Sequence, residues 1–259
     1  MDRRRIPGPE TSVSPIIERS EDAKETPTLG EGDKRHDGRK VEDIRPIFLK
    51  TGLITQANGS AYIELCETKI ACAIYGPRQT KLPAFSGKGN LNCDFKFASF
   101  SCAKRRSNHR DPQEKEFSQL LYEALVPSLR LDLLPKSTID VYVSVIQNDG
   151  TASCLAAAIT CASMALTDAG IEMVDQVAAC AASYINDEIF IDGDFFEEQR
   201  ESGSIVLSYM PSLNEITHII QSGEVDVATT SQAVELCVDV CSKIYSVMRH
   251  SLLEPVKKQ

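Results

Sequence analysis

The stretch from residue 138 to residue 185 constrains the fold more than any other part of the sequence. Thr138–Gln147 predicts a strand, the Ala-rich run Thr151–Asp168 predicts a helix, and Val174–Ile185 predicts a second strand. A helix-length crossover between two strands is the β-α-β arrangement. The chain is therefore expected to build a sheet with a helix packed against it.

The segments before this stretch add a hairpin, a strand and a helix. Ser60–Cys66 and Lys69–Tyr75 are β-rich and are joined by a Glu67-Thr68 turn, which predicts a hairpin. Leu91–Phe100 alternates apolar and polar residues as a half-buried strand does. Pro112–Arg130 places apolar residues on one helical face, and Asp111 before Pro112 predicts an N-cap.

After residue 185 the pattern predicts three strands, an acidic turn and a terminal helix. Because strands and helices mix without strict alternation and no repeat of about 20–50 residues is visible, we expect an α+β body rather than a solenoid. The predicted strands are Glu188–Ile191, Ser204–Met210 and Glu215–Ser222, and the helix runs from Thr229 to about Leu252.

Composition limits the class of protein. The chain has 259 residues and is 42% hydrophobic, which excludes a wholly disordered chain. Residues 1–36 are poor in aliphatic side chains and predict a flexible N-terminal extension, followed by one folded domain over residues 37–259. No apolar run approaches the roughly 20 residues of a membrane span, and none resembles a signal peptide. We therefore expect neither a membrane protein nor a secreted one.

Charge and cysteines narrow the range of ligands. A net charge of −9 argues against independent binding of RNA or DNA, whose affinity comes largely from cations that neutralise phosphates. The nine cysteines lie mostly in apolar segments and include no CxxC pair, so we interpret them as reduced core residues. Cys237 and Cys241 alone make a poor zinc site, and no metal is expected.

Three segments are candidates for chemistry, each with a plainer interpretation. Asn148–Ser153 closes a strand and opens a helix, where exposed N–H groups favour an anion such as phosphate or simply form an N-cap. Asp192-Gly193-Asp194 with Glu197-Glu198 is an acidic cluster for Mg²⁺ or acid–base work, or an acidic surface turn. Lys104-Arg105-Arg106 with Arg110 suits a phosphate backbone or a solvated loop.

A series of short motifs runs through residues 37 to about 250. They are Asp37-Gly38-Arg39, Arg45-Pro46, Gly59–Tyr62, Lys69–Arg78, Cys93-Asp94-Phe95, Ser99–Arg106, Pro135–Gln147, Ala165–Met173 and Met210–Leu213. In this order the motifs resemble the ribonuclease PH family, and within it the ring subunits of the eukaryotic RNA exosome. The resemblance implies the ribonuclease PH fold (ribosomal protein S5 domain 2-like), with mixed β-sheets packed with helices.

Active members of that family cleave the terminal phosphodiester of RNA with inorganic phosphate. The resemblance places Ala152 and Ser153 where those members carry a hydroxyl residue and an Arg, and Ser204 where they carry an Asp. A hydroxyl cannot replace a bidentate cation, and serine is a poor general acid near neutral pH. Because losing one electrostatic stabiliser costs about 10²–10³ in rate, we expect a catalytically silent member with no catalytic residues, cofactor or metal.

The function implied is that of a non-catalytic subunit that scaffolds the six-membered ring and helps to guide single-stranded RNA through its pore for 3′-5′ processing and degradation. The resemblance further implies an obligate hetero-oligomer with other ribonuclease PH-like ring subunits and S1/KH cap subunits, in nucleus, nucleolus and cytoplasm. The alternative is an active phosphate-dependent 3′-5′ exoribonuclease with an atypical site, in which Arg200 and Glu201 substitute for the missing groups. The expected RNA-binding residues are Arg105, Arg106 and Arg110, followed by Arg78 and Lys104.

Overall fold

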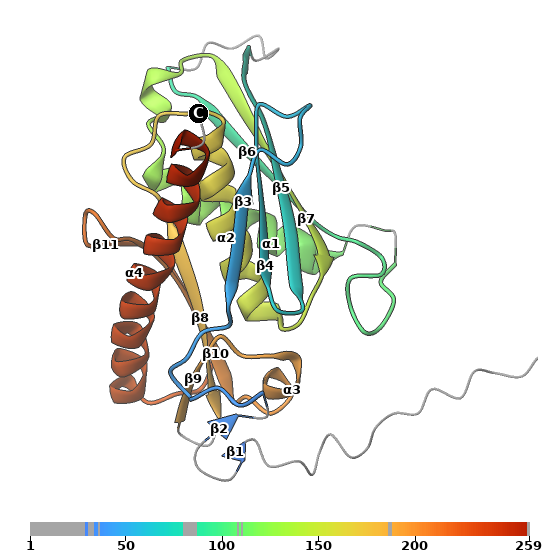
Figure 1. Cartoon of the computed structure of the whole chain (residues 1–259), viewed down its shortest axis with the longest axis vertical. Coiled ribbons are helices and arrows are strands. Elements are labelled where there is room, and N and C mark those ends of the chain that lie inside the picture. Colours follow the sequence, from blue (N-terminus) through green and yellow to red (C-terminus); the bar gives the residue numbers. More distant parts are fainter. Residues whose placement is uncertain are drawn as a thin grey trace, which may run out of the picture.

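Two β-sheets enclose a central helix in the computed structural model of the chain (Figure 1). One sheet has five strands in the order β3-β4-β5-β7-β6, and the other has four in the order β11-β10-β8-β9. This mixed architecture confirms the predicted α+β class. The residues that the structure describes are 29–30, 34–35, 37–79, 87–107, 109, 111–185 and 188–257.

The five-stranded sheet contains the predicted hairpin. β4 and β5 pair antiparallel with Leu65 opposite Thr68, so the turn lies at Cys66-Glu67, one residue earlier than predicted. β3 was not predicted and adds to the other edge of β4. The strands are β3 (Ile47–Thr51), β4 (Gly59–Leu65), β5 (Thr68–Gln79), β6 (Asn90–Phe97) and β7 (Ser137–Gln147).

Helix α1 (Pro112–Leu125) connects β6 to β7, which lies parallel beside β6 in the sheet, so these three elements form a β-α-β unit. Its N-cap is Asp111, as predicted. The helix ends at Leu125 rather than Arg130, since Pro127 has no N–H to continue the hydrogen-bond ladder. The β-α-β unit of this sheet therefore lies one strand earlier in the chain than the sequence pattern indicated.

The prediction of a β-α-β unit around residues 138–185 was wrong in its pairing. Helix α2 (Thr151–Asp168) connects β7 to β8 (Ala178–Ile185), which belongs to the four-stranded sheet. Every residue of α2 from Ser153 to Leu166 is buried, and α2 packs on β4 and β5 on one side and on β8 and β10 on the other. A helix that is apolar all round needs neighbours on all sides, so the next strand joins the second sheet.

The four-stranded sheet follows the predicted order of elements. All of β8 is buried, because both α2 and the C-terminal helix pack against it. A one-turn helix stands where only an acidic turn was expected. The remaining elements are β9 (Glu188–Ile191), α3 (Phe195–Glu198), β10 (Gly203–Met210), β11 (Glu215–Gly223) and α4 (Val227–Lys257).

Part of the predicted extension belongs to the folded body. β1 (Leu29–Gly30) and β2 (Lys34–Arg35) form a short antiparallel ribbon, and Arg35 is only 2% exposed. The predicted boundary at residue 37 is therefore too late for Arg35. Residues 1–28 lie outside the described residues, so their flexibility stays a prediction.

Helix α2 is long and apolar enough to cross a membrane by length and composition, but 78% of it is buried inside the fold. That burial is typical of a core helix.

The cysteines are reduced thiols: all nine are free, and six of them lie in the core. Burial raises the pKa of the Cys93 and Cys161 thiols to about 12, so both stay neutral, Cys161 within the core and Cys93 packed against it.

Candidate functional site at the start of helix α2

A groove of about 1040 Å³ lies at the N-terminal end of α2. The loop after β6 (residues 100–106) forms one wall, the end of β7 and the first residue of α2 form the floor, and α3 forms the other wall. This groove therefore brings together all three segments that the sequence singled out for chemistry.

The start of α2 already holds an anion from the chain itself. The Thr151 amide donates to Glu198 Oε2 at 2.6 Å, so a carboxylate from α3 occupies a position that suits a phosphate oxygen. Gly150 makes the preceding turn with a φ of +113°, and a Cβ there would lie 2.8 Å from the Gly193 carbonyl. Only glycine fits this turn without displacing the backbone.

Ser153 does not face a ligand. It is 3% exposed, and its Oγ donates to the Gly193 carbonyl at 3.1 Å, so the hydroxyl serves to tie α2 to the segment before α3. Ala152 beside it carries no polar side-chain atom. Neither of these two sequence-predicted positions supplies a positive charge at the helix start.

Ser204 lies on β10 and shares a 2.9 Å hydrogen bond with Ser222 of β11. Between it and Glu198 lies Glu201, one of whose oxygens, Oε2, is buried without a hydrogen-bond partner. Burial raises the pKa of Glu201 above its ordinary value, the negative charge of Glu198 raises it further, and the hydroxyls of Ser183 and Ser204 oppose the shift.

The carboxylates of the acidic cluster are each engaged within the protein. Buried Asp192 accepts from Arg45 Nη2 at 2.6 Å and from Arg45 Nε at 2.9 Å. Burial alone would raise the pKa of Asp192, but the hydrogen bonds and charge of Arg45 hold it below its ordinary value. Glu197 pairs with Arg35, and Asp194 caps α3 by accepting from the Glu197 amide at 2.9 Å. In the described parts of the chain, no three His, Cys, Asp or Glu side chains converge as a metal site.

The basic loop divides into two kinds of residue. The Arg106 guanidinium lies 3.9 Å from the centre of the Phe97 ring and donates to Gln113 Oε1 at 2.9 Å, so it holds the loop in place. Lys104 and Arg105 are exposed and line the groove. Arg110, also predicted to bind RNA, lies outside the described residues.

Arg78 is not part of the same site. In the sheet, Arg78 of β5 lies opposite Thr138 at the start of β7. The basic loop instead contacts the end of β7, where the Asn148 amide donates to the Ser101 carbonyl at 2.8 Å. About ten residues of strand at roughly 3.4 Å each separate these points, or about 30 Å. The Arg78 side chain is 57% exposed and lies 3.6 Å from Asp140.

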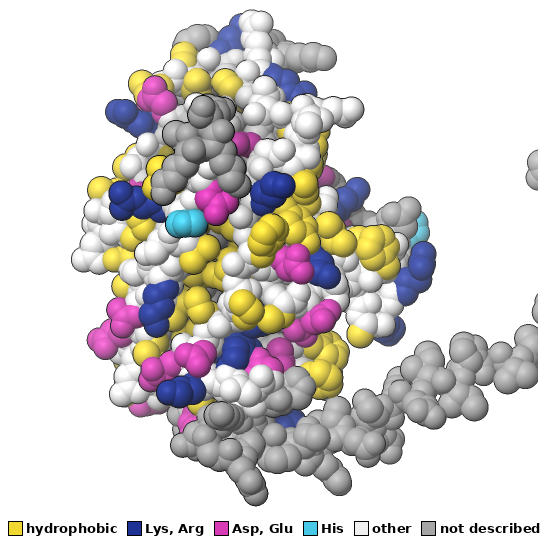
Figure 2. All heavy atoms as spheres, viewed as in Figure 1, with side chains coloured by type: hydrophobic (Ala, Val, Ile, Leu, Met, Phe, Trp, Pro, Cys, Tyr) yellow, Lys and Arg dark blue, Asp and Glu magenta, His cyan; other side chains and the backbone are white. Residues whose placement is uncertain are grey.

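Charge is evenly mixed over the face shown in Figure 2, where Lys and Arg side chains alternate with Asp and Glu. No large area of one sign is visible on that face.

Sequence reasoning missed several residues that build the site. Arg45 was noted only as part of a motif, and Arg35 was assigned to the extension; both are buried counter-ions of acidic residues about 150 positions away. No local pattern identifies such partners. One local signal could have identified part of the site, namely the adjacent aromatic pair Phe195-Phe196. These side chains are 39% and 47% exposed on the groove wall.

A mixed five-stranded sheet and an antiparallel four-stranded sheet around a buried helix, with a tight glycine turn at its start, define the class of ribonuclease PH-like proteins. Residues 43–172 match the model of the 3′ exoribonuclease family, domain 1. The chain belongs to this family, which confirms the resemblance and the fold expected from the sequence.

Individual relatives agree over nearly the whole chain. The chain is 38% identical to exosome complex component mtr3 of Schizosaccharomyces pombe over 256 residues, which cover 97% of this chain and 96% of that protein. It is 34% identical to exosome complex component MTR3 of Homo sapiens over 275 residues, covering 100% and 97% respectively. The crystal structure of rice Rrp46 superposes with a TM-score of 0.75 at 25% identity, covering 84% of this chain and 100% of that one.

Proposed function

We propose that the chain is a ring subunit of the RNA exosome that carries no phosphorolytic activity of its own. Family membership and near-complete coverage of two exosome components support the ring role. Single-stranded RNA would pass the assembled ring for 3′-5′ processing and degradation.

The main observation in support of the proposed lack of phosphorolytic activity is the hydrogen bond between Glu198 and the Thr151 amide. An incoming phosphate must displace a carboxylate or approach it, and like charges repel by several kcal/mol at such short range in a partly buried site. Arg45 does not offset this repulsion, because its guanidinium is committed to Asp192 and Asp149. Ser153 and Ser204 add hydroxyls but no charge.

Guidance of RNA rests on Lys104 and Arg105, which are exposed and have no ion pair with any described residue. A few cations suffice when several subunits share one strand and no sequence is read. The net charge of −9 supports a chain whose main partners are proteins. We further propose other ribonuclease PH-like subunits and S1/KH cap subunits as partners, in nucleus, nucleolus and cytoplasm.

The test measures nucleoside diphosphate release from single-stranded RNA with phosphate and Mg²⁺, and phosphate binding by the purified full chain. We expect no release and no saturable phosphate binding up to millimolar concentrations. Glu201→Gln and the matched exposed control Glu188→Gln should behave alike. Nucleoside diphosphate release that Glu201→Gln abolishes and Glu188→Gln leaves intact would establish the alternative, an exoribonuclease with an atypical acid.

Ring membership is tested separately by purifying the complex with a tagged full chain and identifying its components by mass spectrometry. We expect other ribonuclease PH-like proteins in near-stoichiometric amounts. Recovery of the chain by itself, under conditions that keep it folded, would contradict the ring role.

A further inference from the structure

The edges of the two main sheets differ in how their backbone groups are satisfied. An edge strand directs the N–H and C=O groups of alternate residues away from the sheet, where they template another strand unless something caps them. Four strands occupy such edges: β3 and β6 in the five-stranded sheet, and β9 and β11 in the four-stranded sheet.

Two of these edges are capped by distant parts of the chain. At β3, α4 lies alongside and Ser251 Oγ donates to the Leu49 carbonyl at 2.9 Å. At β9, the Ile191 amide donates to the Val41 carbonyl at 3.1 Å, and the Arg35 guanidinium donates to the Ile191 carbonyl.

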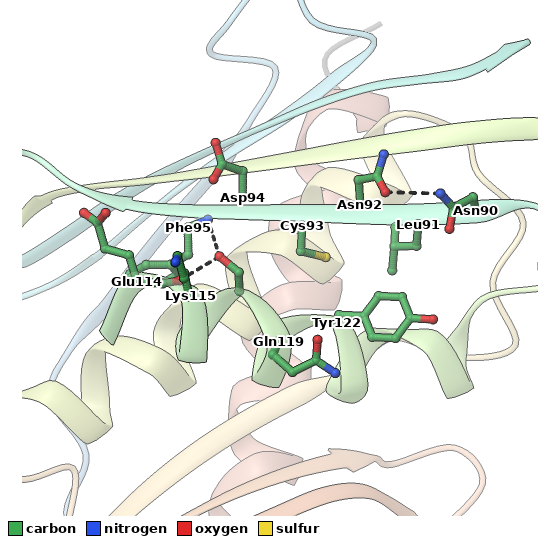
Figure 3. A pocket seen from close by; sticks show the side chains of 11 residues that line it. Asn90, Leu91, Asn92, Cys93, Asp94, Phe95, Glu114, Lys115, Gln119 and Tyr122 are labelled. Carbon is green, nitrogen blue, oxygen red and sulfur yellow. Dashed lines mark hydrogen bonds between the residues drawn. The ribbon is translucent and has the colours of Figure 1, made fainter. Parts of the chain in front are cut away.

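The edge of β6 is covered by α1, as Figure 3 shows. The Phe95 amide donates to Ser118 Oγ and the Phe97 amide to Glu114 Oε1, each at 3.0 Å. The first half of β6 borders a groove of about 400 Å³, over which α1 places Gln119 and Tyr122. A strand cannot lie along β6 without displacing these side chains.

The edge of β11 has no such hydrogen-bonded cap among the described residues, although α1 contacts the strand. Within the described residues, no backbone group of β11 is hydrogen-bonded outside its ladder with β10. The strand has nine residues, about 30 Å of edge, and exposes Ile216 by 42% and Ile219 by 44%. Between Ile216 and Ser222 it carries no Lys, Arg, Asp, Glu or Pro, the residues that natural edge strands use to prevent pairing.

Charge near β11 indicates the kind of partner. Glu215 at one end and Glu224 and Asp226 beyond the other are exposed, and none of them pairs with a described cation. Between Ile216 and Gly223 the one ionisable side chain of the strand is His218, which lies 3.5 Å from Glu123 of α1. An uncharged edge between acidic ends repels a nucleic acid and suits a protein strand with basic flanks.

We propose that β11 receives an extended segment of a neighbouring ring subunit, which adds a fifth strand to the four-stranded sheet. The segment is uncharged and rich in β-branched residues that cover Ile216 and Ile219, with Lys or Arg at its ends facing Glu215 and Glu224. This inference rests on the proposed ring role, since that role supplies the neighbour.

The test compares backbone hydrogen exchange of β11 in the isolated full chain and in the complex purified with it. We expect alternate amides of β11 to exchange at least tenfold more slowly in the complex, because only the outward N–H groups gain a partner. Ile219→Lys should remove this protection and reduce recovery of one neighbour, whereas Leu133→Lys, at an exposed apolar site elsewhere, should change neither. Circular dichroism establishes that both variants stay folded.

The outcomes separate this inference from the ring role. If the wild-type chain recovers no ring proteins, the ring role fails. If it recovers them and β11 exchanges equally fast free and assembled, or Ile219→Lys leaves protection intact, strand addition at β11 is wrong. Protection of the same amides in the isolated chain, growing with its concentration, would assign the edge to a second copy and overturn the proposed partner.

Discussion

The ion pair between Arg45 and Asp192 should be a principal determinant of stability beside the degenerate site. The two side chains are 2% and 9% exposed and make two hydrogen bonds of 2.6 and 2.9 Å. Arg45→Met leaves the buried Asp192 carboxylate with only the more distant Arg39, at 3.8 Å, as a counter-ion, which costs about 3–5 kcal/mol. At about 2–4 °C per kcal/mol for a chain of this size, the melting temperature should fall by roughly 6–20 °C.

The assay is urea and thermal unfolding followed by circular dichroism, since the chain has no Trp. Asp192 sits at a φ of +55°, which Asn tolerates, so the double variant Arg45→Met/Asp192→Asn removes the charge without backbone strain. It should be more stable than Arg45→Met at pH 7. Lys50→Met, at an exposed position on β3, is the matched control and should change the free energy of unfolding by less than about 0.5 kcal/mol.

The difference in unfolding free energy between the wild-type chain and Arg45→Met should change with pH in one direction. In the wild-type chain the pKa of Asp192 is held below its ordinary value, so the stabilisation is present above that ordinary value and is lost as pH falls through the lowered pKa. In Arg45→Met, we expect burial to outweigh the remaining attraction of Arg39 and to raise the pKa of Asp192, so the stability difference from wild type should narrow between pH 7 and about pH 4. A loss below about 1 kcal/mol at pH 7, or a difference independent of pH, would refute this reasoning.

Three further predictions follow from packing and charge. Gly59→Ala should cost about 1–3 kcal/mol of unfolding free energy, because its Cβ would lie 2.5 Å from the Ala165 carbonyl, whereas Gly87→Ala meets nothing within 4 Å and should be neutral in the same melts. Arg106→Ala should cost about 1–3 kcal/mol through its contacts with Phe97 and Gln113, while Arg105→Ala should stay within about 0.5 kcal/mol. Arg105→Glu should weaken the binding of single-stranded RNA to the purified complex and reduce the slope of log affinity against log salt concentration by about 0.7. The measurement is fluorescence anisotropy at several salt concentrations, and the control Lys243→Glu on α4 should leave both the affinity and the slope unchanged.

Local patterns predicted most elements, because turns, caps and apolar periodicity act within a few residues. The hairpin, the N-cap at Asp111 and the strands after residue 185 needed no knowledge of distant partners. The three segments that contribute residues to the groove were singled out for the same reason, since each carries a dense local signal; their meeting in one groove was not predicted.

The sequence by itself determined that α2 would be a buried helix, since its apolar residues face every direction, and that the segment Asn148–Ser153 contributes no Arg of its own at the helix start. Only the tertiary structure decided that β8 joins a second sheet, that Glu198 reaches the Thr151 amide, and that Arg106 supports the loop while Arg105 forms no ion pair with a described residue. Helix and turn formation depend on neighbours in sequence, whereas ion pairs and sheet order depend on which surfaces the closed chain brings together. That is why Arg35 and Glu197, 162 residues apart, were beyond any reading of the sequence.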